Sequence, residues 1–518
     1  MINKSILDLK FKNYNLKRYA LVADRGNPAV ITQSALLAKI LNSEYKIDSF
    51  VISDYSKKSR SKDLYDQLGI KEFYNIFKIV SLDRKIIFFI KAWIAFLKII
   101  FFSVKKKFTF FHFINNYKYL GIKSGDVIYD TYIRYNHRYR DPSIFNYSFI
   151  KVFILTIYKI EIIIFFLKEK KIKVIIASSK AYNSISNLLI KCSLALNIKA
   201  LLISGQFIKF FKKQEDNLNF IWNVNYNKIK NKNKIFVKKN INSFYYKRFF
   251  KNQKTGEFVD FKTLEKLYGK NTKKNFNFIN KIFKINKINK YYINCLALHC
   301  FSDAPSSTGE FIFRDYYDQF IKTLEFLREN NPPNFYWLIK EHPQSSDYGE
   351  KDIVKKVLNK FNLPFVKICP ENINNIILFK TINNLYTGRS TIGLEYACFG
   401  KKPIICGVSP YSENNISINA KNCKHYFKLL ISNDVNNILT TKKRFIAIKI
   451  LYFLEKYSNL VIKDKSLIIP SRESKNDFSL FLKNINSNFN SSKLKNLIED
   501  PYFFSLKKTL FNNLKFYI

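Results

Sequence analysis

A histidine followed by a proline stands at the end of an apolar run and could act on a phosphate. The run Phe335–Ile339 leads into Lys340-Glu341-His342-Pro343. An imidazole can donate a hydrogen bond to a phosphate oxygen and can protonate a leaving phosphate. Pro343 ends the strand and fixes the direction of the chain beside His342. We therefore expect Lys340, His342 and Pro343 at a nucleotide site, with a surface histidine in a turn as the alternative.

A second loop has the features of a helix N-terminus that binds an anion. Gly388 permits a tight turn, and Ser390 or Thr391 can cap the helix that follows. Free N–H groups, the helix dipole and the Arg389 guanidinium would then favour one anion. Glu395, one turn further on, could reach a ribose diol. A capped helix without a ligand is the alternative.

Both loops follow predicted parallel strands at their carboxyl ends, where open α/β sheets bind ligands. We therefore expect His342 and Ser390 along one sheet edge, facing a shared cleft and a single phosphate. The chain contains no Asp-x-Asp pair of the kind that holds a divalent ion on a sugar diphosphate, so we expect no metal and no cofactor. A donor with one phosphate, such as a CMP-sugar, suits such a site.

The catalytic base is the least defined part of the site. Transfer to a sugar hydroxyl needs a carboxylate or imidazole within hydrogen-bond reach, and in a two-domain cleft it usually comes from the first domain. Asp24 is the first choice, Asp303 the second and Glu310 the third, although each could equally form a turn or cap a helix. His299 and Cys300 lie at a strand end, where we expect them to be packed.

The elements that would position these residues alternate between strands and helices, which predicts an α/β fold. We expect strands at 19–23, 48–53, 127–132, 173–177, 199–203, 292–299, 335–340, 364–368, 384–387 and 404–407, and helices at 29–41, 182–196, 313–328, 353–361 and 372–379. The predicted organisation is an acceptor-side α/β domain at 1–205, a Lys/Asn-rich connection at 206–290, a nucleotide-sugar-binding α/β domain at 291–430 and a helical tail at 431–518.

A basic apolar helix at 84–105 is inserted into the first domain. Arg84, Lys91, Lys98 and Lys105 recur every seven residues among isoleucine, phenylalanine and tryptophan. This pattern fits a helix lying in a lipid headgroup layer with its lysines directed to phosphates, and it fits equally a core helix with a solvated lysine stripe. We expect no transmembrane span, and the apolar run 149–166 is predicted to be a buried helix.

Composition excludes a disordered basic tail. The chain has 518 residues, of which 47% are hydrophobic, and a formal net charge of +49. A biased coding sequence explains this charge without any partner; an anionic membrane surface or a nucleic acid are the alternatives. The seven cysteines form no C-x-x-C pair and the first residues resemble no secretory signal, so we expect a cytoplasmic chain, free or peripheral on the inner face of the cytoplasmic membrane.

Several of these segments together resemble bacterial surface-carbohydrate and capsule polysaccharide biosynthesis proteins, which are similar to GT-B glycosyltransferases. The resemblance is carried by 298–305, 313–317, 340–343 and 388–403, and more weakly by 121–130 and Asp24. It implies two Rossmann-like domains facing each other across a cleft. It also implies that His342, with Ser390 and Thr391, holds a cytidine nucleotide, as His-Pro and Ser/Thr motifs do in CMP-sugar-using transferases. The segment 177–182 lacks the histidine expected there.

The resulting hypothesis is a glycosyltransferase of bacterial surface polysaccharide synthesis, for capsule or lipopolysaccharide. It would take a nucleotide-sugar donor and a saccharide or lipid-linked saccharide acceptor. The rivals are a CDP-alditol glycerophosphotransferase-like polymerase and a nucleotide-sugar epimerase. A basic nucleic-acid-binding protein is more distant, because no helix-turn-helix, zinc spacing or localised basic patch with aromatic residues is visible. We therefore expect no nucleic-acid partner.

Overall fold

The computed structural model divides the chain into two compact units. The first comprises 1–131, 143–218 and 457–518, and the second comprises 132–142 and 219–456. The residues described are 19–24, 30–54 (except 32–33, 36, 39–40 and 43–45), 60–105, 108–204 (except 138 and 180), 207–211, 242–249, 278–285, 290–433 (except 308 and 372) and 437–456. Residues 25–29, most of the connection 206–290 and the tail from 457 lie outside these residues.

The first unit is built on a six-stranded sheet in the order β3-β2-β1-β6-β7-β8. Neighbouring strands are parallel except β8, which pairs antiparallel with β7. The central strands are continuous buried runs, as expected for a parallel sheet covered on both faces. The strands are β1 Tyr19–Ala23, β2 Asp48–Ser53, β3 Phe73–Asn75, β6 Ile172–Ala177, β7 Lys199–Ser204 and β8 Phe207–Phe211.

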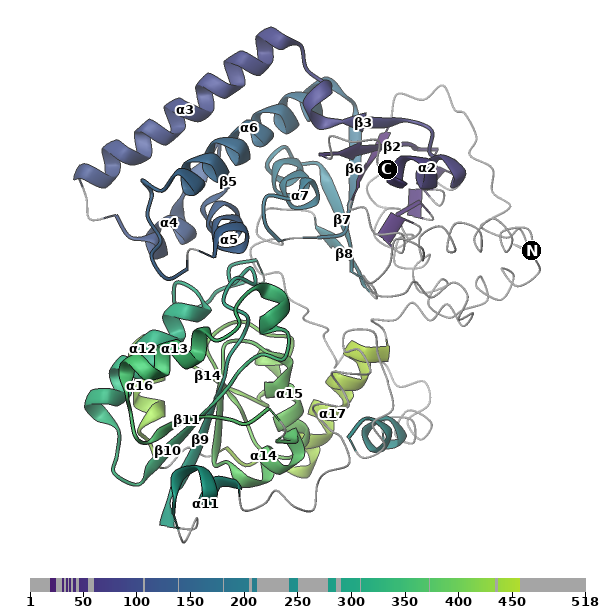
Figure 1. The fold of residues 1–518 in the computed structure, drawn as a ribbon. Helices are drawn as coiled ribbons and strands as arrows, with labels where there is room; N and C mark the ends of the chain where they lie inside the picture. The colour runs from purple at the N-terminus through teal and green to yellow at the C-terminus, as the bar shows by residue number, and fades with distance from the viewer. Residues whose placement is uncertain are drawn as a thin grey trace. The chain divides into compact units, whose positions relative to one another are not determined.

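Helices and a short hairpin surround this sheet (Figure 1). The helices include α2 Arg60–Gln67, α3 Leu82–Lys105, α4 Phe110–Asn116, α5 Gly125–Asn136, α6 Tyr147–Glu169 and α7 Ile185–Ala195, with a 3₁₀ turn at Ile76–Lys78 and the hairpin β4 Lys118–Tyr119 with β5 Ile122–Lys123. Within the expected helix 29–41, the described residues are helical.

The strand expected at 127–132 is wrong, because these residues belong to α5. Every residue from Gly125 to Tyr132 is buried, so this part of the helix has no solvent-exposed face. The segment therefore lacks the 3.6-residue period that identifies an amphipathic helix. The helix begins where Asp126 accepts a hydrogen bond from the Val127 amide and pairs with Lys191 of α7 at 2.9 Å. A short buried segment of this kind does not by itself distinguish a strand from a buried helix.

Helix α3 lies alongside α6, and only one of its faces is packed (Figure 1). Phe88, Ala92, Phe96 and Ile99 are buried on that face, and Lys91 pairs with Glu161 of α6 at 3.1 Å. The other side of α3 is largely exposed and carries large apolar residues as well as lysines, so α3 is not a core helix with only a lysine stripe in solvent. By length and composition alone, α3 could cross a membrane. The apolar run 149–166 is confirmed as the buried helix α6.

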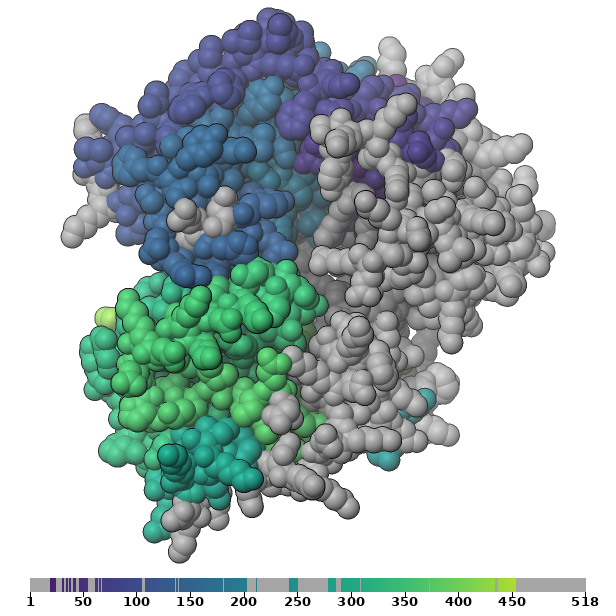
Figure 2. All heavy atoms as spheres, in the orientation of Figure 1, coloured from purple at the N-terminus to yellow at the C-terminus, as the bar shows by residue number. Residues whose placement is uncertain are grey.

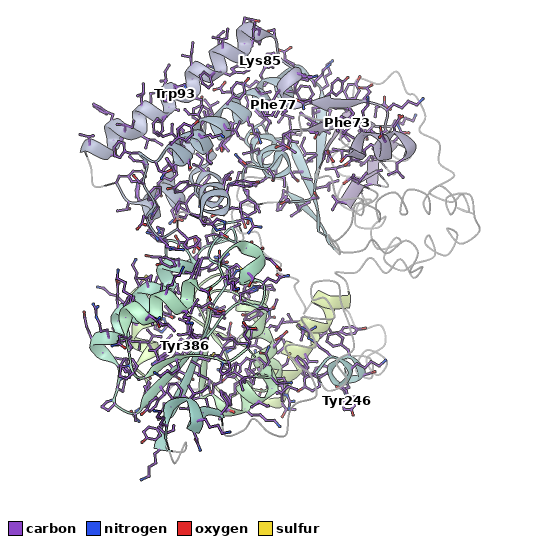
Figure 3. The ribbon with its side chains drawn as sticks, viewed as in Figure 1. Phe73, Phe77, Lys85, Trp93, Tyr246 and Tyr386 are labelled. Carbon is purple, nitrogen blue, oxygen red and sulfur yellow. The ribbon has the colours of Figure 1, made fainter. Side chains whose placement is uncertain are left out.

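The second unit contains a six-stranded sheet whose neighbouring strands are all parallel, in the order β11-β10-β9-β12-β13-β14. Trp337 and Tyr386, the latter labelled in Figure 3, are buried side chains from two of these strands. The strands are β9 Tyr292–Ala297, β10 Phe335–Lys340, β11 Val366–Ile368, β12 Asn384–Thr387, β13 Ile404–Ile405 and β14 Ile418–Asn419.

The helices of the second unit confirm the alternation expected from the sequence. Each unit is therefore a Rossmann-like α/β unit, and the predicted fold class is confirmed. The helices include α11 Phe278–Phe283, α12 Tyr316–Asn330, α13 Ile353–Phe361, α14 Asn375–Thr381, α15 Thr391–Cys398, α16 Cys423–Leu430 and α17 Thr441–Lys456, with 3₁₀ turns at Ser345–Tyr348 and Ser412–Asn414. Helix α17 packs on α15 within this unit.

Candidate functional site

The two loops expected to bind phosphate lie at the same edge of the second sheet, with one strand between them. The His342 loop follows β10 and the Gly388 loop follows β12, and both strands pair with the central strand β9. The segment after β9 begins at Leu298, whose amide donates to the Lys340 carbonyl at 2.9 Å. The loop that contains His299 is therefore the structural link between the two predicted loops.

His299 makes the contacts that connect these loops. Its ring stacks on His342 with centroids 5.4 Å apart, and on Tyr316 of α12 with centroids 4.3 Å apart. Tyr316 in turn lies against Gly388, where a Cβ would come within 2.9 Å of the tyrosine ring. Sequence reasoning treated His299 as a packed residue. Its place at the end of the central strand, between two polar loops, was the signal that could have identified it.

His342 is held as a neutral imidazole whose Nδ1 is an acceptor. The Gln344 amide donates to Nδ1 at 3.3 Å, and the Cys300 thiol lies 3.1 Å from the same nitrogen. The ring proton is therefore assigned to Nε2. Burial, with a smaller contribution from the charge of His299, lowers the pKa of His342 to about 3. At neutral pH the ring can donate a hydrogen bond to a phosphate, whereas it lacks the second proton that the expected protonation of a leaving phosphate requires.

Opposing charges act on His299. Burial is the largest effect and lowers its pKa, and the Arg389 guanidinium acts in the same direction. Asp303 opposes them, since its carboxylate lies 3.6 Å from Nδ1 of His299. Asp303, the second candidate base, is thus placed beside an imidazole at this edge.

The loop after β9 is held in shape by Glu350, a residue that sequence reasoning missed. Both carboxylate oxygens of this buried side chain accept hydrogen bonds, from the amides of Phe301 and Ser302, each at 2.8 Å. Burial raises the pKa of Glu350, and these two hydrogen bonds oppose that shift. The Glu350 carboxylate therefore positions the segment that follows His299.

The Gly388 loop leads directly into α15. Ser390 is the N-cap, but its side chain makes no capping hydrogen bond, and Thr391 is exposed in the first turn. The Tyr411 hydroxyl donates to the Ser390 carbonyl at 2.7 Å and lies where a Cβ on Gly393 would be. The Tyr411 hydroxyl thus holds the start of α15 in place. The hydroxyl of Ser390 does not cap the helix.

Arg389 is only 8% exposed and lies against the chain before α12. Its guanidinium donates to the Glu310 carbonyl at 3.3 Å and is 5.1 Å from the centroid of the Phe311 ring. Glu310, the third candidate base, is exposed, and it contacts Arg389 through its backbone carbonyl. The remaining expected residues of the first loop differ in exposure, because Lys340 is 8% exposed and Pro343 is exposed.

The ribose contact expected for Glu395 is not supported. Its side chain is buried and forms an ion pair with Arg248 at 2.6 Å, and Asn375 donates to its second oxygen at 3.4 Å. A carboxylate enclosed by these partners stabilises the interior of the second unit. Glu395 is therefore not part of the proposed site.

Asp24 belongs to the first unit and follows β1. It is 2% exposed, and its amide donates to the Ile52 carbonyl at 2.9 Å. Its charge contributes, after burial, to the raised pKa of Tyr65. Among the described residues, no group of three or more His, Cys, Asp or Glu side chains is arranged to hold a metal ion.

Comparison with known proteins finds a family model that matches the segment carrying these loops. Residues 217–425 match the family model described as capsule polysaccharide biosynthesis protein. The resemblance is confirmed for this segment. The matched segment, 217–425, contains the loops after β9, β10 and β12, together with Arg248 and Glu395. No curated protein matches the sequence.

Solved structures similar to the chain include two transferases and an epimerase. The Thermosulfurimonas dismutans KpsC beta Kdo 2,7 transferase is 17% identical, with a TM-score of 0.21, over 33% of this chain and 51% of that one. The match thus spans about half of that transferase. The KpsC beta Kdo 2,4 transferase of the same organism is 14% identical, with a TM-score of 0.31, over 54% and 79%. The UDP-GlcNAc 2-epimerase from Neisseria meningitidis is 11% identical, with a TM-score of 0.23, over 84% and 99%.

Proposed function

We propose that this protein is a glycosyltransferase of bacterial surface polysaccharide synthesis whose second unit binds the phosphate of a nucleotide-sugar donor. One observation supports this most: His299 stacks on His342 and, through Tyr316, contacts the Gly388 loop, so the two predicted phosphate loops form one continuous edge. The match to the capsule polysaccharide biosynthesis family over 217–425 includes this whole edge.

The groups at this edge are suited to bind a phosphate. Nε2 of His342 is a neutral donor, Arg389 supplies a cation, and the amides at the start of α15 supply further donors with the positive end of the helix dipole. Lys340 is the remaining expected ligand. We infer a nucleoside monophosphate sugar, such as a CMP-sugar, as the donor, because the chain has no Asp-x-Asp pair of the kind that holds a divalent ion on a sugar diphosphate.

The acceptor side of the reaction belongs to the first unit in this proposal. The acceptor is a saccharide or a lipid-linked saccharide, with the protein in the cytoplasm at an anionic membrane surface. Asp24 or Asp303 would remove the proton from the attacking hydroxyl. The contact between Asp303 and His299 supports the second choice, because a neighbouring imidazole can share the proton that the carboxylate accepts.

Ligand-dependent stability tests the donor assignment directly. Binding that is restricted to the folded protein raises the free energy of unfolding by about 2.7 kcal/mol when the ligand is at a hundredfold excess over its Kd. We expect CMP to raise the melting temperature more than UDP or GDP, and His342→Ala to remove the effect. His425→Ala, which changes a partly buried histidine on α16 of the same unit, is the matched control. Equal shifts for wild type and His342→Ala would contradict the site.

Product analysis separates the reaction from its rivals. A glycosyltransferase incubated with a CMP-sugar and an acceptor releases CMP and forms a glycosidic bond. A CDP-alditol polymerase releases CMP but forms a phosphodiester, and an epimerase returns a nucleotide sugar without transfer. Either of these two outcomes would overturn the proposed reaction while leaving the phosphate site in place.

A further inference from the structure

The outer side of α3 is a continuous apolar face. Seven large side chains, spaced three or four residues apart along the helix, are between 40% and 79% exposed: Leu82, Ile86, Ile90, Trp93, Leu97, Phe101 and Val104. This spacing places them on one side of the helix, opposite the face that packs on α6. Figure 2 shows α3 along the surface of the molecule, and Figure 3 labels Trp93 on it.

Basic residues flank this face. Arg84, Lys91 and Lys98 follow one another at seven-residue intervals, so they form a stripe between the packed side and the exposed apolar side. Arg84 lies over the Phe165 ring of α6 at 4.0 Å, which keeps its cation on this flank. An apolar face beside a cationic stripe matches the layers of an anionic membrane surface, where acyl chains lie beneath phosphates.

A pocket of about 860 Å³ opens on the same flank, within the first unit. It lies between α3, α4 and the β4–β5 hairpin, and its buried walls include Ala95, Ile99 and Phe113. The exposed residues that line it, and so mark its mouth, include Lys98 and Lys118. The volume is in the range of pockets that enclose small organic ligands, about 300–1,000 Å³.

The polar groups of the pocket favour an anion at its mouth. Glu161, the carboxylate among the lining residues, is already bound by Lys91 and by the Tyr119 hydroxyl. Three lysines line the pocket against this one glutamate, which leaves two positive charges in excess. An amphiphile with an anionic head and an apolar chain complements both the mouth and the walls.

We propose that the first unit docks on an anionic lipid bilayer through the exposed face of α3, and that the adjacent pocket takes the acyl chain of one phosphate-bearing lipid. With the α3 face among the acyl chains, the lysine stripe and the pocket mouth lie at the level of the headgroups. This inference deepens the membrane association included in the proposed function but uses no residue of the donor site. Its failure would therefore leave the donor assignment untouched.

Vesicle binding by the full-length protein tests the docking face. We expect sedimentation with vesicles of phosphatidylserine and phosphatidylcholine, and little with phosphatidylcholine alone. Leu97→Glu should lower the partition coefficient about tenfold or more, since it places a charge among acyl chains. Ile438→Glu, on an exposed isoleucine of the second unit, is the matched control. Wild-type binding to neither vesicle, or unchanged binding of Leu97→Glu, would overturn the docking.

Trp93 provides a direct probe of insertion. Brominated phosphatidylcholine in the vesicles should quench the part of the tryptophan emission that Trp93→Phe removes, whereas Trp337 is fully buried in the second unit. Absence of quenching would contradict insertion of this face. A molar mass in solution that falls on Leu97→Glu, without vesicle binding by wild type, would show instead that the face binds a second copy of the chain.

Monomeric lysophosphatidic acid tests the pocket separately. We expect one molecule to bind by titration calorimetry, with Lys98→Glu and Lys118→Glu each weakening binding about fivefold or more. Lys168→Glu makes the same charge change on an exposed residue of α6 outside the pocket and should bind normally. Ile94→Trp should block binding by filling the pocket. No binding by wild type, or equal binding by all four variants, would overturn the pocket assignment.

Discussion

The imidazole rings of His299 and His342 stack with their centroids 5.4 Å apart at the carboxyl edge of two neighbouring strands. The rings are nearly parallel, and both pKa values are lowered chiefly by burial. Two neutral rings can stack without the repulsion that two imidazolium ions would suffer. The pair therefore presents hydrogen-bond donors at neutral pH, and a bound phosphate would favour protonation of either ring.

Replacing His342 should affect turnover more than folding. His342→Ala removes the Nε2 donor, and we expect the turnover number with a CMP-sugar to fall about a hundredfold. His342→Asn keeps an N–H donor and should recover part of the loss. Steady-state rates of the two variants, compared with His425→Ala, measure this effect. Near-normal turnover by His342→Ala would remove this residue from the site.

His299 is expected to act as a positioning residue for His342. His299→Phe preserves a ring between His342 and Tyr316 and should retain more activity than His299→Ala, which leaves both neighbours unsupported. A purely structural role would instead lower the melting temperature of both variants in proportion to their loss of activity. Thermal unfolding measured alongside KM and the turnover number distinguishes these outcomes.

Acid should destabilise the second unit through His342. The unfolded histidine titrates near 6.5 and the folded one near 3, so between these values the unfolded chain binds more protons. The free energy of unfolding should therefore decrease as the pH falls from 6.5 toward 3, by up to about 1.4 kcal/mol per pH unit for this group.

Urea unfolding at several pH values measures that slope. His342→Gln should show a shallower slope across this window, because the carboxylates that titrate in the same range are common to both proteins. Identical slopes would mean that the folded pKa of His342 is not lowered.

The position of Gly388 predicts a steric effect on the site. Gly388→Ala places a Cβ 2.9 Å from Cε1 of Tyr316 and 3.3 Å from Oε1 of Gln319, so the tyrosine ring must move. Since Tyr316 stacks on His299, we expect weaker CMP binding in this variant. Tyr316→Leu in the Gly388→Ala background should relieve the clash without restoring the stack. Calorimetric titration with CMP would show whether Gly388→Ala binds as wild type, which would disprove the coupling.

The buried pair Arg248–Glu395 should be important for stability. Arg248→Ala leaves a buried carboxylate without its guanidinium, and we expect a loss of about 3–5 kcal/mol in the free energy of unfolding. The double variant Arg248→Met with Glu395→Leu removes both charges and should lose much less. Equal losses in single and double variants, measured by urea unfolding, would contradict this explanation.

The local elements of the second unit could be predicted from sequence because their signals are short-range. The bounds of Asn384–Thr387 and Ile353–Phe361 agree residue for residue with β12 and α13. Polar residues delimit the strand, and amphipathic spacing marks the helix. Helix α5 was missed because its first eight residues are buried on every side. The position of the His342 and Gly388 loops at one edge of the sheet was predictable, because both loops follow the carboxyl ends of parallel strands.

The features that sequence reasoning missed or misassigned depend on long-range contacts. Arg248 and Glu395 are 147 residues apart, and nothing near Glu395 indicates that its carboxylate is enclosed. His299 was visible as a residue type, but its role depends on which strand occupies the centre of the sheet. The order β10-β9-β12 places the first strand of the unit between two later ones.

The grip of Glu350 on the amides of Phe301 and Ser302 has a consequence for engineering. The carboxylate comes from a residue 49 positions downstream of Phe301. Residues 298–305 therefore cannot be transplanted onto another parallel sheet as a self-contained peptide. In a new host, two enclosed N–H groups would lack an acceptor unless a carboxylate were grafted from a separate segment at the same time.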